Sequence, residues 1–558
     1  MSPEPPNASL LTTTAQVRAG LQLVIFTAVV LVLVIFLDNR YRVLPQSIHN
    51  HLPAHHPGFV VTDVTVVTCS AINPFSSCTK DGPNWHRIEK DLYLGSGYVS
   101  TAYLHVRRKK EDDLEPHEEI VLDVKVGRSV PSDVDPTSKD VRWESRPAGI
   151  WVKKTAKRHI GDAAKLVTGV DVLFGPDAAD PRSNWAVSHT SLFLDAAGDT
   201  PEPRLTVRKG PAISNLQKPV PRIRKDGKFK IMQASDLHLA TGLGKCRDAM
   251  PAGSPCEADT RTLQFVERLL EDEKPDLIIL SGDQVNGDTA PDAQTAIYKY
   301  SALFAQYKIP YAGIFGNHDD EGNLDRAGSM AIMDGLPYSL STAGPEDIDG
   351  VGNYVVEILG RGSTSHSALT LYLLDTHSYS PDERKFRGYD WLHNNQIDWF
   401  RSTSQSLKRK HKEYTHIHMN LAFIHIPLPE YRNPHQFSVV GNWSENPTAP
   451  GYNSGFMDAL IQENVLLVSC GHDHVNDYCV PGANEKKEPA LWMCYGGGAG
   501  FGGYGGYYGY HRRMRFFEFD MNEARITTWK RMEYGDLEKK VDEQIVVDGG
   551  RIHVAVQE

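Results

Sequence analysis

The sequence predicts an α/β fold for its C-terminal part, because apolar runs of strand length alternate there with amphipathic helical segments. The run Leu277–Leu280 is typical. It is bounded by Pro275 and Gly282, is too short for a helix, and fits a strand buried on both faces of a parallel sheet. Several such runs each precede a residue that can ligate a metal. Ligands bind at the carboxyl ends of strands in open α/β sheets, so these side chains are expected to converge.

The length and charge of the chain limit the other possibilities. Its 558 residues exceed one ordinary core, which favours two domains with appendages. Its net charge of −11 argues against non-specific nucleic-acid binding, which needs a basic surface to release counterions. No nucleic-acid partner is therefore expected.

An uncharged apolar run, residues 19–37, is the first feature along the chain. As a helix it would be about 28 Å long at about 1.5 Å per residue, close to the hydrocarbon thickness of a bilayer. A buried core helix is disfavoured by the polar flanks, and a cleaved signal peptide by the missing small-residue cleavage site. The run predicts a single-pass transmembrane anchor, and hence membrane localisation. It lies between a disordered segment, 1–18, and a stalk, 38–58.

The orientation of this anchor depends on two opposing observations. Arg40 and Arg42 after the run outweigh Arg18 before it, which favours a cytosolic catalytic part. The cysteines form three locally spaced pairs with one left over: Cys69 and Cys78, Cys246 and Cys256, Cys470 and Cys479, and Cys494. Such pairs suit short disulfide loops in an oxidising lumen, and Asn442 begins a glycosylation sequon. We favour a lumenal or extracellular catalytic part.

Residues 59–218 predict a β-rich accessory domain, with a sandwich as the expected form. The runs 60–68 and 120–126 are rich in β-branched residues, and 149–152 and 192–194 resemble further strands. No run here ends in a candidate ligand, so the domain's sequence indicates no function.

A proline- and charge-rich joint, 219–227, precedes the α/β domain, 228–532, which is followed by a C-terminal extension, 533–558. Helices are expected from about 259, over 292–307 and from about 395. Strands are expected over 354–359 and 369–374, with closing strands at 515–520 and 525–532. The glycine-rich run 496–506 lacks the following helix that a nucleotide-binding loop requires, so we expect a flexible loop at the rim of the cleft.

The residues that follow the predicted strands form a candidate dinuclear metal site. They are Asp236, His238, Asp283, Asn317, His425, His472 and His474. Histidine nitrogens and carboxylate oxygens are common ligands of divalent ions, and one carboxylate, here Asp283, can bridge two ions about 3.5–4 Å apart. Each motif alone is weak, but five in this order, each after a buried-type strand, predict one metal centre.

These motifs resemble the calcineurin-like metallophosphoesterase superfamily. The matching runs are Asp236-Leu237-His238, Gly282-Asp283, Gly316-Asn317-His318-Asp319, His425 and Gly471-His472-Asp473-His474. The resemblance implies a four-layer α/β/β/α sandwich over about residues 228–532. It also implies one ion on Asp236, His238, Asp283 and His474, and a second on Asp283, Asn317, His425 and His472. The chain looks most similar to the purple-acid-phosphatase-like branch with fungal and plant members.

Two positions depart from true purple acid phosphatases. Those enzymes carry a tyrosine three residues after the bridging aspartate, where this chain has Asn286, and they lack a histidine at the position of His238. Without a phenolate ligand no purple colour is expected. The nitrogen and oxygen donors suit two divalent ions drawn from Mn, Fe and Zn.

The expected activity is hydrolysis of phosphate monoesters, with phosphoproteins among the possible substrates. His318 is the expected general acid or phosphate donor, oriented by Asp319 or Asp283, although a structural histidine is the alternative. His377 and Tyr379 are weaker candidates for lining the pocket. A phosphodiesterase with the same metals is the near rival. A weakly active regulator that binds a protein partner through the β-rich domain is the rival of a different class.

Overall fold

The computed structural model describes residues 9–41, 58–70, 72, 78–97, 99–115, 117–133, 140–156, 166–195, 198–212, 216–413, 416–433 and 437–554. The chain divides into two compact units. Unit 1 comprises Met1–Val172, Ser188–Asp195 and Leu205–Ala212, and unit 2 comprises Leu173–Val187, Ala196–Arg204 and Ile213–Glu558.

Helix α1 (Ser9–Tyr41) contains the apolar run 19–37. Within the described residues, however, no helix combines the length and the apolar character needed to cross a membrane. The predicted transmembrane anchor is therefore wrong, and so is the membrane localisation with its lumenal or extracellular orientation. The prediction relied on a single uncharged run. Such a run does not by itself establish a helix that is both long enough and apolar enough to cross a membrane. Residues 1–8, and most of the predicted stalk 38–58, lie outside the described residues, whereas residues 9–18 belong to α1.

Unit 1 is dominated by short antiparallel sheets with the strand orders β1-β3-β2 and β4-β6-β5. Their strands are β1 (Phe59–Ser70), β2 (Trp85–Arg87), β3 (Ser100–Lys110), β4 (Ile120–Val126), β5 (Val141–Ser145) and β6 (Ile150–Thr155). A further sheet, β7-β9-β8, contains β7 (Val167–Phe174), β8 (Trp185–Val187) and β9 (Pro203–Lys209). The runs 60–68 and 120–126 are strands as predicted, whereas 192–194 is irregular.

Unit 2 contains two mixed sheets. The seven-stranded sheet has the order β12-β11-β10-β19-β20-β21-β22, and the six-stranded sheet has the order β13-β14-β15-β16-β18-β17. The first consists of β10 (Lys228–Ala234), β11 (Leu277–Ser281), β12 (Tyr311–Ile314), β19 (Arg513–Asp520), β20 (Arg525–Met532), β21 (Val541–Asp548) and β22 (Arg551–Ile552). The second consists of β13 (Tyr354–Leu359), β14 (Ser367–Leu373), β15 (Met419–Phe423), β16 (Val465–Cys470), β17 (Cys479–Ala483) and β18 (Pro489–Tyr495). The helices are α3 (Ala258–Glu273), α4 (Ala293–Tyr307), α5 (Arg326–Asp334), α6 (Asn394–His411) and α7 (Phe456–Gln462).

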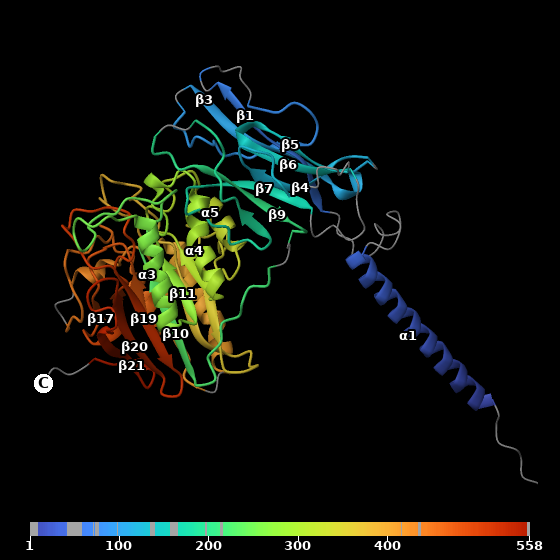
Figure 1. The fold of residues 1–558 in the computed structure, drawn as a ribbon. Coiled ribbons are helices and arrows are strands. Elements are labelled where there is room, and N and C mark those ends of the chain that lie inside the picture. Colours follow the sequence, from blue (N-terminus) through green and yellow to red (C-terminus); the bar gives the residue numbers. More distant parts are fainter. Residues whose placement is uncertain are drawn as a thin grey trace, which may run out of the picture. The chain divides into compact units, whose positions relative to one another are not determined.

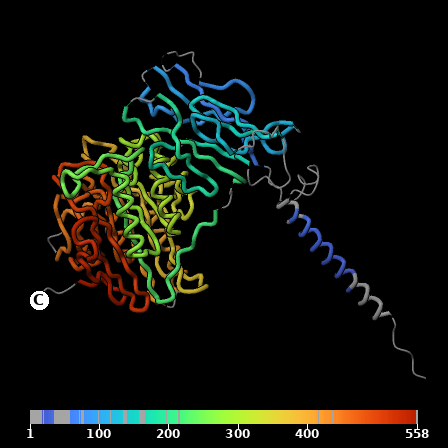
Figure 2. Tube along the Cα trace, viewed as in Figure 1, coloured from blue at the N-terminus to red at the C-terminus, as the bar shows by residue number. Residues whose placement is uncertain are grey.

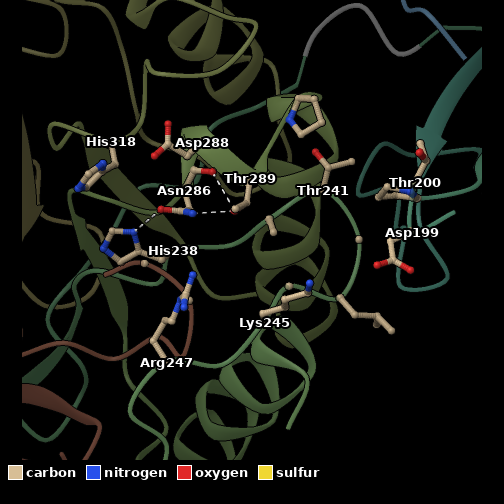
Figure 3. A pocket seen from close by; sticks show the side chains of 18 of the residues that line it. Asp199, Thr200, His238, Thr241, Lys245, Arg247, Asn286, Asp288, Thr289 and His318 are labelled. Carbon is tan, nitrogen blue, oxygen red and sulfur yellow. Dashed lines mark hydrogen bonds between the residues drawn. The ribbon is translucent and has the colours of Figure 1, made fainter. Parts of the chain in front are cut away.

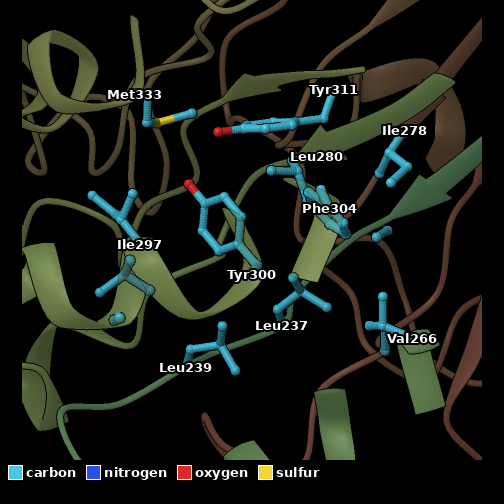
Figure 4. Packing of buried hydrophobic residues seen from close by; sticks show 14 of the residues in the cluster. Leu237, Leu239, Val266, Ile278, Leu280, Ile297, Tyr300, Phe304, Tyr311 and Met333 are labelled. Atoms are coloured by element: carbon cyan, nitrogen blue, oxygen red, sulfur yellow. The ribbon is translucent and has the colours of Figure 1, made fainter. Parts of the chain in front are cut away.

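Alternating side chains of the strands divide the apolar core of unit 2 into three clusters. On β10 and β11, Met232 and Ile278 pack with α3 and α4, whereas Ile231 and Ile279 pack against the second sheet. The far face of that second sheet packs against α6 and α7. Figure 1 shows α3 and α4 beside β10 and β11, and Figure 4 shows Tyr300 and Phe304 of α4 packed near Leu280 and Tyr311. The layer order is therefore helix, sheet, sheet, helix, and the predicted α/β class is confirmed.

The C-terminal strands complete the seven-stranded sheet, as predicted for 515–520 and 525–532. Strand β19 pairs antiparallel with the central strand β10, with Lys228 opposite Asp520 and Gln233 opposite Arg515. Figure 2 shows this red part of the trace beside the green segment that contains β10. The sheet also continues past residue 532 through β21 and β22.

The structure confirms two of the three predicted cysteine pairs, Cys69–Cys78 and Cys246–Cys256. The third is wrong, because Cys479 pairs with Cys494 and Cys470 is a free, buried thiol. Cys479 and Cys494 lie directly opposite each other on the antiparallel strands β17 and β18. Spacing along the chain favoured the nearer Cys470 and could not reveal this strand register.

Candidate metal centre

The predicted ligands lie in turns directly after strands of both sheets of unit 2. Asp236 and His238 follow β10, Asp283 follows β11 and Asn317 follows β12, all in the seven-stranded sheet. His425 follows β15, and His472 and His474 follow β16, in the six-stranded sheet. The candidate site is thus assembled from both sheets.

Four of the candidate ligands, in three of these turns, lie in the left-handed backbone region. The φ angles are +56° at Asp236, +47° at His238, +54° at Asp283 and +78° at His472. Residues with a Cβ adopt this region at an energetic cost, and such strain concentrates at functional sites where the surrounding structure enforces it.

The glycines of the motifs allow segments to approach closely. A Cβ on Gly316 would lie 2.1 Å from Oδ1 of Asp283, and one on Gly282 would lie 2.2 Å from Nδ1 of His425. Any larger residue would therefore displace a ligand side chain, which explains the glycine of each Gly-Asp and Gly-Asn-His-Asp run.

The ligand side chains gather into two buried groups. One contains Asp236, His238 and His474, the other contains Asp283, His425 and His472, and within each group the candidate ligand atoms lie within 4.8 Å of one another. Asp283 connects the groups, because its Oδ2 is 3.2 Å from Nε2 of His425 and 3.7 Å from Nε2 of His238. This is the position that a bridging carboxylate requires.

Three of the four candidate ligand histidines contact an oxygen atom through Nδ1. Nδ1 of His425 is 2.9 Å from the carbonyl oxygen of Ser281, Nδ1 of His238 is 3.3 Å from Oδ1 of Asn286, and Nδ1 of His474 is 3.1 Å from the hydroxyl of Tyr510. With the Nδ1 proton on His238 and His425 donated to these oxygens, the lone pair of each Nε2 faces the centre. Asn286 and His238, the two departures from the purple acid phosphatase pattern, thus contact each other.

The atoms that face the centre fit divalent cations. Oδ2 of Asp283, Oδ1 of Asn317, Nε2 of His425 and both ring nitrogens of His472 are buried and form no hydrogen bond with any described residue. Nε2 of His238 lies 2.9 Å from Nε2 of His474. Without a cation these two nitrogens share one hydrogen bond, and a bound cation would instead accept a lone pair from each. The unsatisfied donors therefore fit two cations, and imidazole and carboxylate donors suit divalent metals.

The pKa shifts of the buried groups differ from one candidate ligand to the next. Burial, reinforced by neighbouring histidine charge, lowers the pKa of His238 and of His472 to about 3, so both are neutral ligands. Burial alone would raise the pKa of Asp283, but His425 outweighs it and holds that pKa well below its usual value. Asp283 also counters the effect of burial on His425 and raises the pKa of that imidazole to about 9, so a cation would have to displace the proton on Nε2 before His425 could bind it.

A third cluster of possible ligands, His377, Asp390 and His393, provides an internal contrast. Its atoms already have partners: Nε2 of His377 is 2.8 Å from Gln396, and the ring nitrogens of His393 lie 2.7 Å from Asp349 and 3.1 Å from Asp390. A protonated His393 satisfies both carboxylates without a metal. His377 and Tyr379 were also possible pocket residues, but they contact Gln396 and Glu321 respectively.

His318 is oriented by a residue that the sequence analysis did not select. Its Nδ1 lies 2.6 Å from Oε2 of Glu321, and the other oxygen of Glu321 accepts a hydrogen bond from Tyr379 at 3.1 Å. Burial lowers the pKa of His318, but Asp283 and Glu321 together raise it above its usual value. The spacing of three residues within Gly-Asn-His-Asp-Asp-Glu was a signal that could have identified Glu321.

Asp319 faces the backbone of the ligand turns. It accepts hydrogen bonds from the amides of Asp283 at 2.8 Å, Val285 at 2.8 Å and Gly316 at 2.7 Å. Burial and the nearby Asp283 raise the pKa of Asp319 to about 7. These contacts fit a residue that holds two ligand turns together, and a catalytic role for Asp319 stays a prediction.

The glycine-rich run packs against the site, contrary to the expected flexible loop. Residues 496–501 are buried, and the amide of Gly500 donates to the carbonyl oxygen of Asp236 at 2.9 Å. Tyr504 stacks on the His474 ring with centroids 4.0 Å apart and donates a hydrogen bond to the carbonyl oxygen of His472. The loop therefore positions two ligand histidines.

A cavity of about 780 Å³ lies beside the ligands. His238 and His318 line it, as do Asn286 and Thr289, and Figure 3 shows the hydrogen bonds that connect His238, Asn286 and Thr289. Its size is typical of pockets for small organic molecules. The candidate metal ligands, His318 and a cavity large enough for an organic group thus lie side by side.

Comparison with known proteins gives a consistent result. A family model described as calcineurin-like phosphoesterase matches residues 229–476. Phosphatase DCR2 of Saccharomyces cerevisiae is 38% identical over 398 residues, which cover 69% of this chain and 67% of that protein. An Arabidopsis thaliana protein named "Probable inactive purple acid phosphatase 29" is 36% identical over 359 residues, which cover 60% of this chain and 90% of that protein. Among solved structures, purple acid phosphatase PPD1 from yellow lupin covers 88% of this chain and 94% of its own at 12% identity and a TM-score of 0.38.

Proposed function

Because this chain belongs to the calcineurin-like phosphoesterase family and is a hydrolase acting on phosphoric esters, we propose that its substrates are phosphate monoesters, phosphoproteins among them. The observation that carries the proposal is the set of buried nitrogen and oxygen atoms that face one another without hydrogen bonds to described residues. Such atoms are stable in a folded protein when cations bind them.

We assign the seven predicted ligands to two overlapping sets. One ion would be held by Asp236, His238, Asp283 and His474, and the other by Asp283, Asn317, His425 and His472. The donors suit Mn, Fe(II) or Zn. When bound, two such ions supply charge that lowers the pKa of a water molecule and neutralises the phosphoryl oxygens.

The chain's own residues supply the rest of the reaction. Asp283 stays ionised because its pKa is low, so its Oδ2, which has no hydrogen-bond partner among the described residues, faces the centre with negative charge. His318 donates a proton from Nε2 to the leaving oxygen, because Nδ1 is held by Glu321 and its raised pKa favours the protonated ring. The amide of His318 donates to Oδ1 of Asp283 at 2.8 Å, which links the acid to the bridging residue.

The test combines metal analysis with turnover of three substrates. We expect about two equivalents of metal per chain and metal-dependent hydrolysis of p-nitrophenyl phosphate, lost on chelation and restored by Mn, Fe or Zn. Asp283→Asn should abolish metal binding and hydrolysis. Asp347→Asn, a change at an exposed aspartate, should alter neither the metal content nor the turnover. Phosphorylated casein tests the phosphoprotein assignment.

Two outcomes would favour the rival functions. Faster turnover of bis-p-nitrophenyl phosphate than of the monoester would assign a phosphodiesterase. Bound metal without turnover of either ester would favour the regulator, and one relative is itself named "Probable inactive purple acid phosphatase 29". The complete set of ligand side chains supports turnover.

A further inference from the structure

The cavity beside the metal centre carries charges that the proposed reaction does not use. Arg247 and Lys245 line it, and both side chains are exposed. Figure 3 shows Arg247 next to His238, with Lys245 further along the same wall. The described part of the chain provides no ion-pair partner for either cation, so both charges are available to an anion that enters the cavity.

The backbone that carries these two cations is fixed. The Arg247 amide donates to the carbonyl oxygen of Phe501 at 2.8 Å, and its own carbonyl oxygen accepts from the Arg512 guanidinium. The disulfide Cys246–Cys256 adjoins Arg247, and Lys245 forms a β-bridge with Glu257. The cationic side chains therefore extend from an ordered base, and little backbone entropy is lost when they bind a ligand.

The adjacent floor of the cavity is rigid as well. The buried ammonium of Lys299 donates to the carbonyl oxygens of Ala240 at 2.9 Å and Gly242 at 2.6 Å. It also contacts the buried carboxylate of Asp259 at 2.7 Å. The charge of Lys299 is thus neutralised inside the protein, which leaves Arg247 and Lys245 as the free positive charges of the cavity.

The rest of the wall has the opposite sign. The carboxylates of Asp199, Glu202 and Asp288 line the cavity, and Figure 3 shows Asp199 and Asp288 apart from Arg247. An anion is repelled by these carboxylates and attracted only to the side where Arg247 and Lys245 lie. The charges thus define one position for a negative group beside the phosphoryl site.

We infer that this cavity is a leaving-group subsite in which Arg247, assisted by Lys245, binds a second anionic group of the substrate. The inference rests on the proposed function, and it narrows the substrate class to phosphate monoesters whose organic part carries another phosphate or a carboxylate. A guanidinium binds either group through two parallel hydrogen bonds.

Two pairs of probes distinguish the sources of the second anion. Fructose 1,6-bisphosphate and fructose 6-phosphate differ by a phosphate on a small molecule. Phosphoserine tetrapeptides with a neighbouring Glu or Gln differ by a carboxylate on a peptide. For at least one pair, wild-type protein should show a kcat/KM about tenfold higher for the probe with the second anion, the size expected of one charge-assisted hydrogen bond.

Substitutions of cationic residues test which side chain causes the higher kcat/KM for the probe with the second anion. Arg247→Ala should reduce the ratio of kcat/KM within the pair to about one, and Arg247→Lys should retain part of it. Lys225→Ala removes an exposed cation before β10, at the strand end opposite the ligands, and should leave the ratio unchanged. Equal kcat/KM for both members of both pairs in the wild type, or an unchanged ratio in Arg247→Ala, would overturn the inference.

A binding measurement separates this inference from the proposed function. Isothermal calorimetry with fructose 1,6-bisphosphate and fructose 6-phosphate on chelator-treated wild type and Arg247→Ala needs no turnover. Tighter binding of the bisphosphate that Arg247→Ala removes supports the subsite even if no ester is hydrolysed. Hydrolysis of p-nitrophenyl phosphate without any second-anion preference in binding or turnover would retain the phosphatase and reject the subsite.

Discussion

His318 depends on its neighbour Glu321 for its orientation. The 2.6 Å contact between them fixes which ring nitrogen faces the cavity, and Tyr379 holds the second oxygen of the carboxylate. A general acid is effective only when its proton points at the leaving oxygen. Glu321 is therefore a positioning residue, although it does not face the substrate itself.

Replacing Glu321 tests this role. Glu321→Gln should lower kcat about tenfold for phenyl phosphate, whose poor leaving group needs a proton, and much less for p-nitrophenyl phosphate. Glu485→Gln, at an exposed position between β17 and β18, is the control. An equal loss for the two esters would argue that Glu321 serves folding and not proton transfer.

His393 links stability to pH. Hydrogen bonding to Asp390, aided by Asp349, raises the pKa of His393 to about 9. Because this is above the value of about 6.5 in the unfolded chain, the protonated ring stabilises the fold fully below pH 6.5. That stabilisation is lost as the pH rises through about 9.

We therefore expect His393→Gln to be less stable than wild type at pH 6 by about 1 kcal/mol, a value reduced for solvent screening. The difference should shrink by pH 10. Urea unfolding at the two pH values measures it, with His553→Gln at an exposed histidine as the control. A difference that does not change with pH would mean that packing, and not charge, is responsible.

Among the elements, the glycine-rich run 496–506 acts as a wall of the metal centre. A Cβ on Gly500 would lie 1.9 Å from the carbonyl oxygen of Leu237, and backbone atoms cannot move aside as a side chain can. The run can therefore approach the β10 turn only because it lacks side chains at such contacts. Low complexity here reflects close packing, which explains why the expectation of a flexible loop was wrong.

Gly500→Ala should destabilise the protein by about 2 kcal/mol and weaken metal retention, because the β10 turn carries Asp236 and His238. Thermal unfolding and metal content after dialysis measure the two effects. Gly335→Ala is the matched control, since a Cβ there would lie at an ordinary 3.6 Å from the carbonyl oxygen of Ile332. Normal metal content in Gly500→Ala would show that the loop can shift without disturbing the ligands.

The strands were predictable because burial on both faces leaves a continuous apolar run in the sequence. Strands 354–359 and 525–532 were predicted with the bounds of β13 and β20. Contacts that depend on three-dimensional register were not predictable. Neither the Cys479–Cys494 pairing nor the contact of Tyr510 with His474 has a signal in local spacing.

For the whole molecule, the metal centre joins the two sheets of unit 2. Asp236, Asp283 and Asn317 follow strands of one sheet, and His425 and His472 follow strands of the other. Ions bound here would crosslink the two halves of the core. Metal binding and stability of the folded state are then thermodynamically linked.

Removing the metals should therefore lower the unfolding temperature of the chain. At a metal concentration of 1,000 times Kd, binding contributes about 4 kcal/mol to stability, which chelation would remove. Differential scanning calorimetry with and without EDTA measures the loss. Asp283→Asn should unfold at the same temperature in both conditions, and a chelator-insensitive wild type would contradict a metal crosslink.

At this scale the candidate ligands could be selected from the sequence because each one follows a recognisable strand. The sequence could not show which atoms face each other, such as the Nε2 atoms of His238 and His474 at 2.9 Å. It also did not reveal Arg247, whose position depends on a disulfide and on the distant Phe501. Motifs identify residues at strand ends, whereas pockets depend on loops from several parts of the chain.

The pairing of β10 with β19 has a consequence for biosynthesis. Lys228 and Glu518, which form an ion pair across these strands, are separated by 290 residues. A ribosome adding about 5–20 residues per second needs roughly 15–60 s to deliver the second strand after the first. During that interval the nascent β10 has an open edge, and we expect a chain that stops before residue 513 to be retained by chaperones or to aggregate.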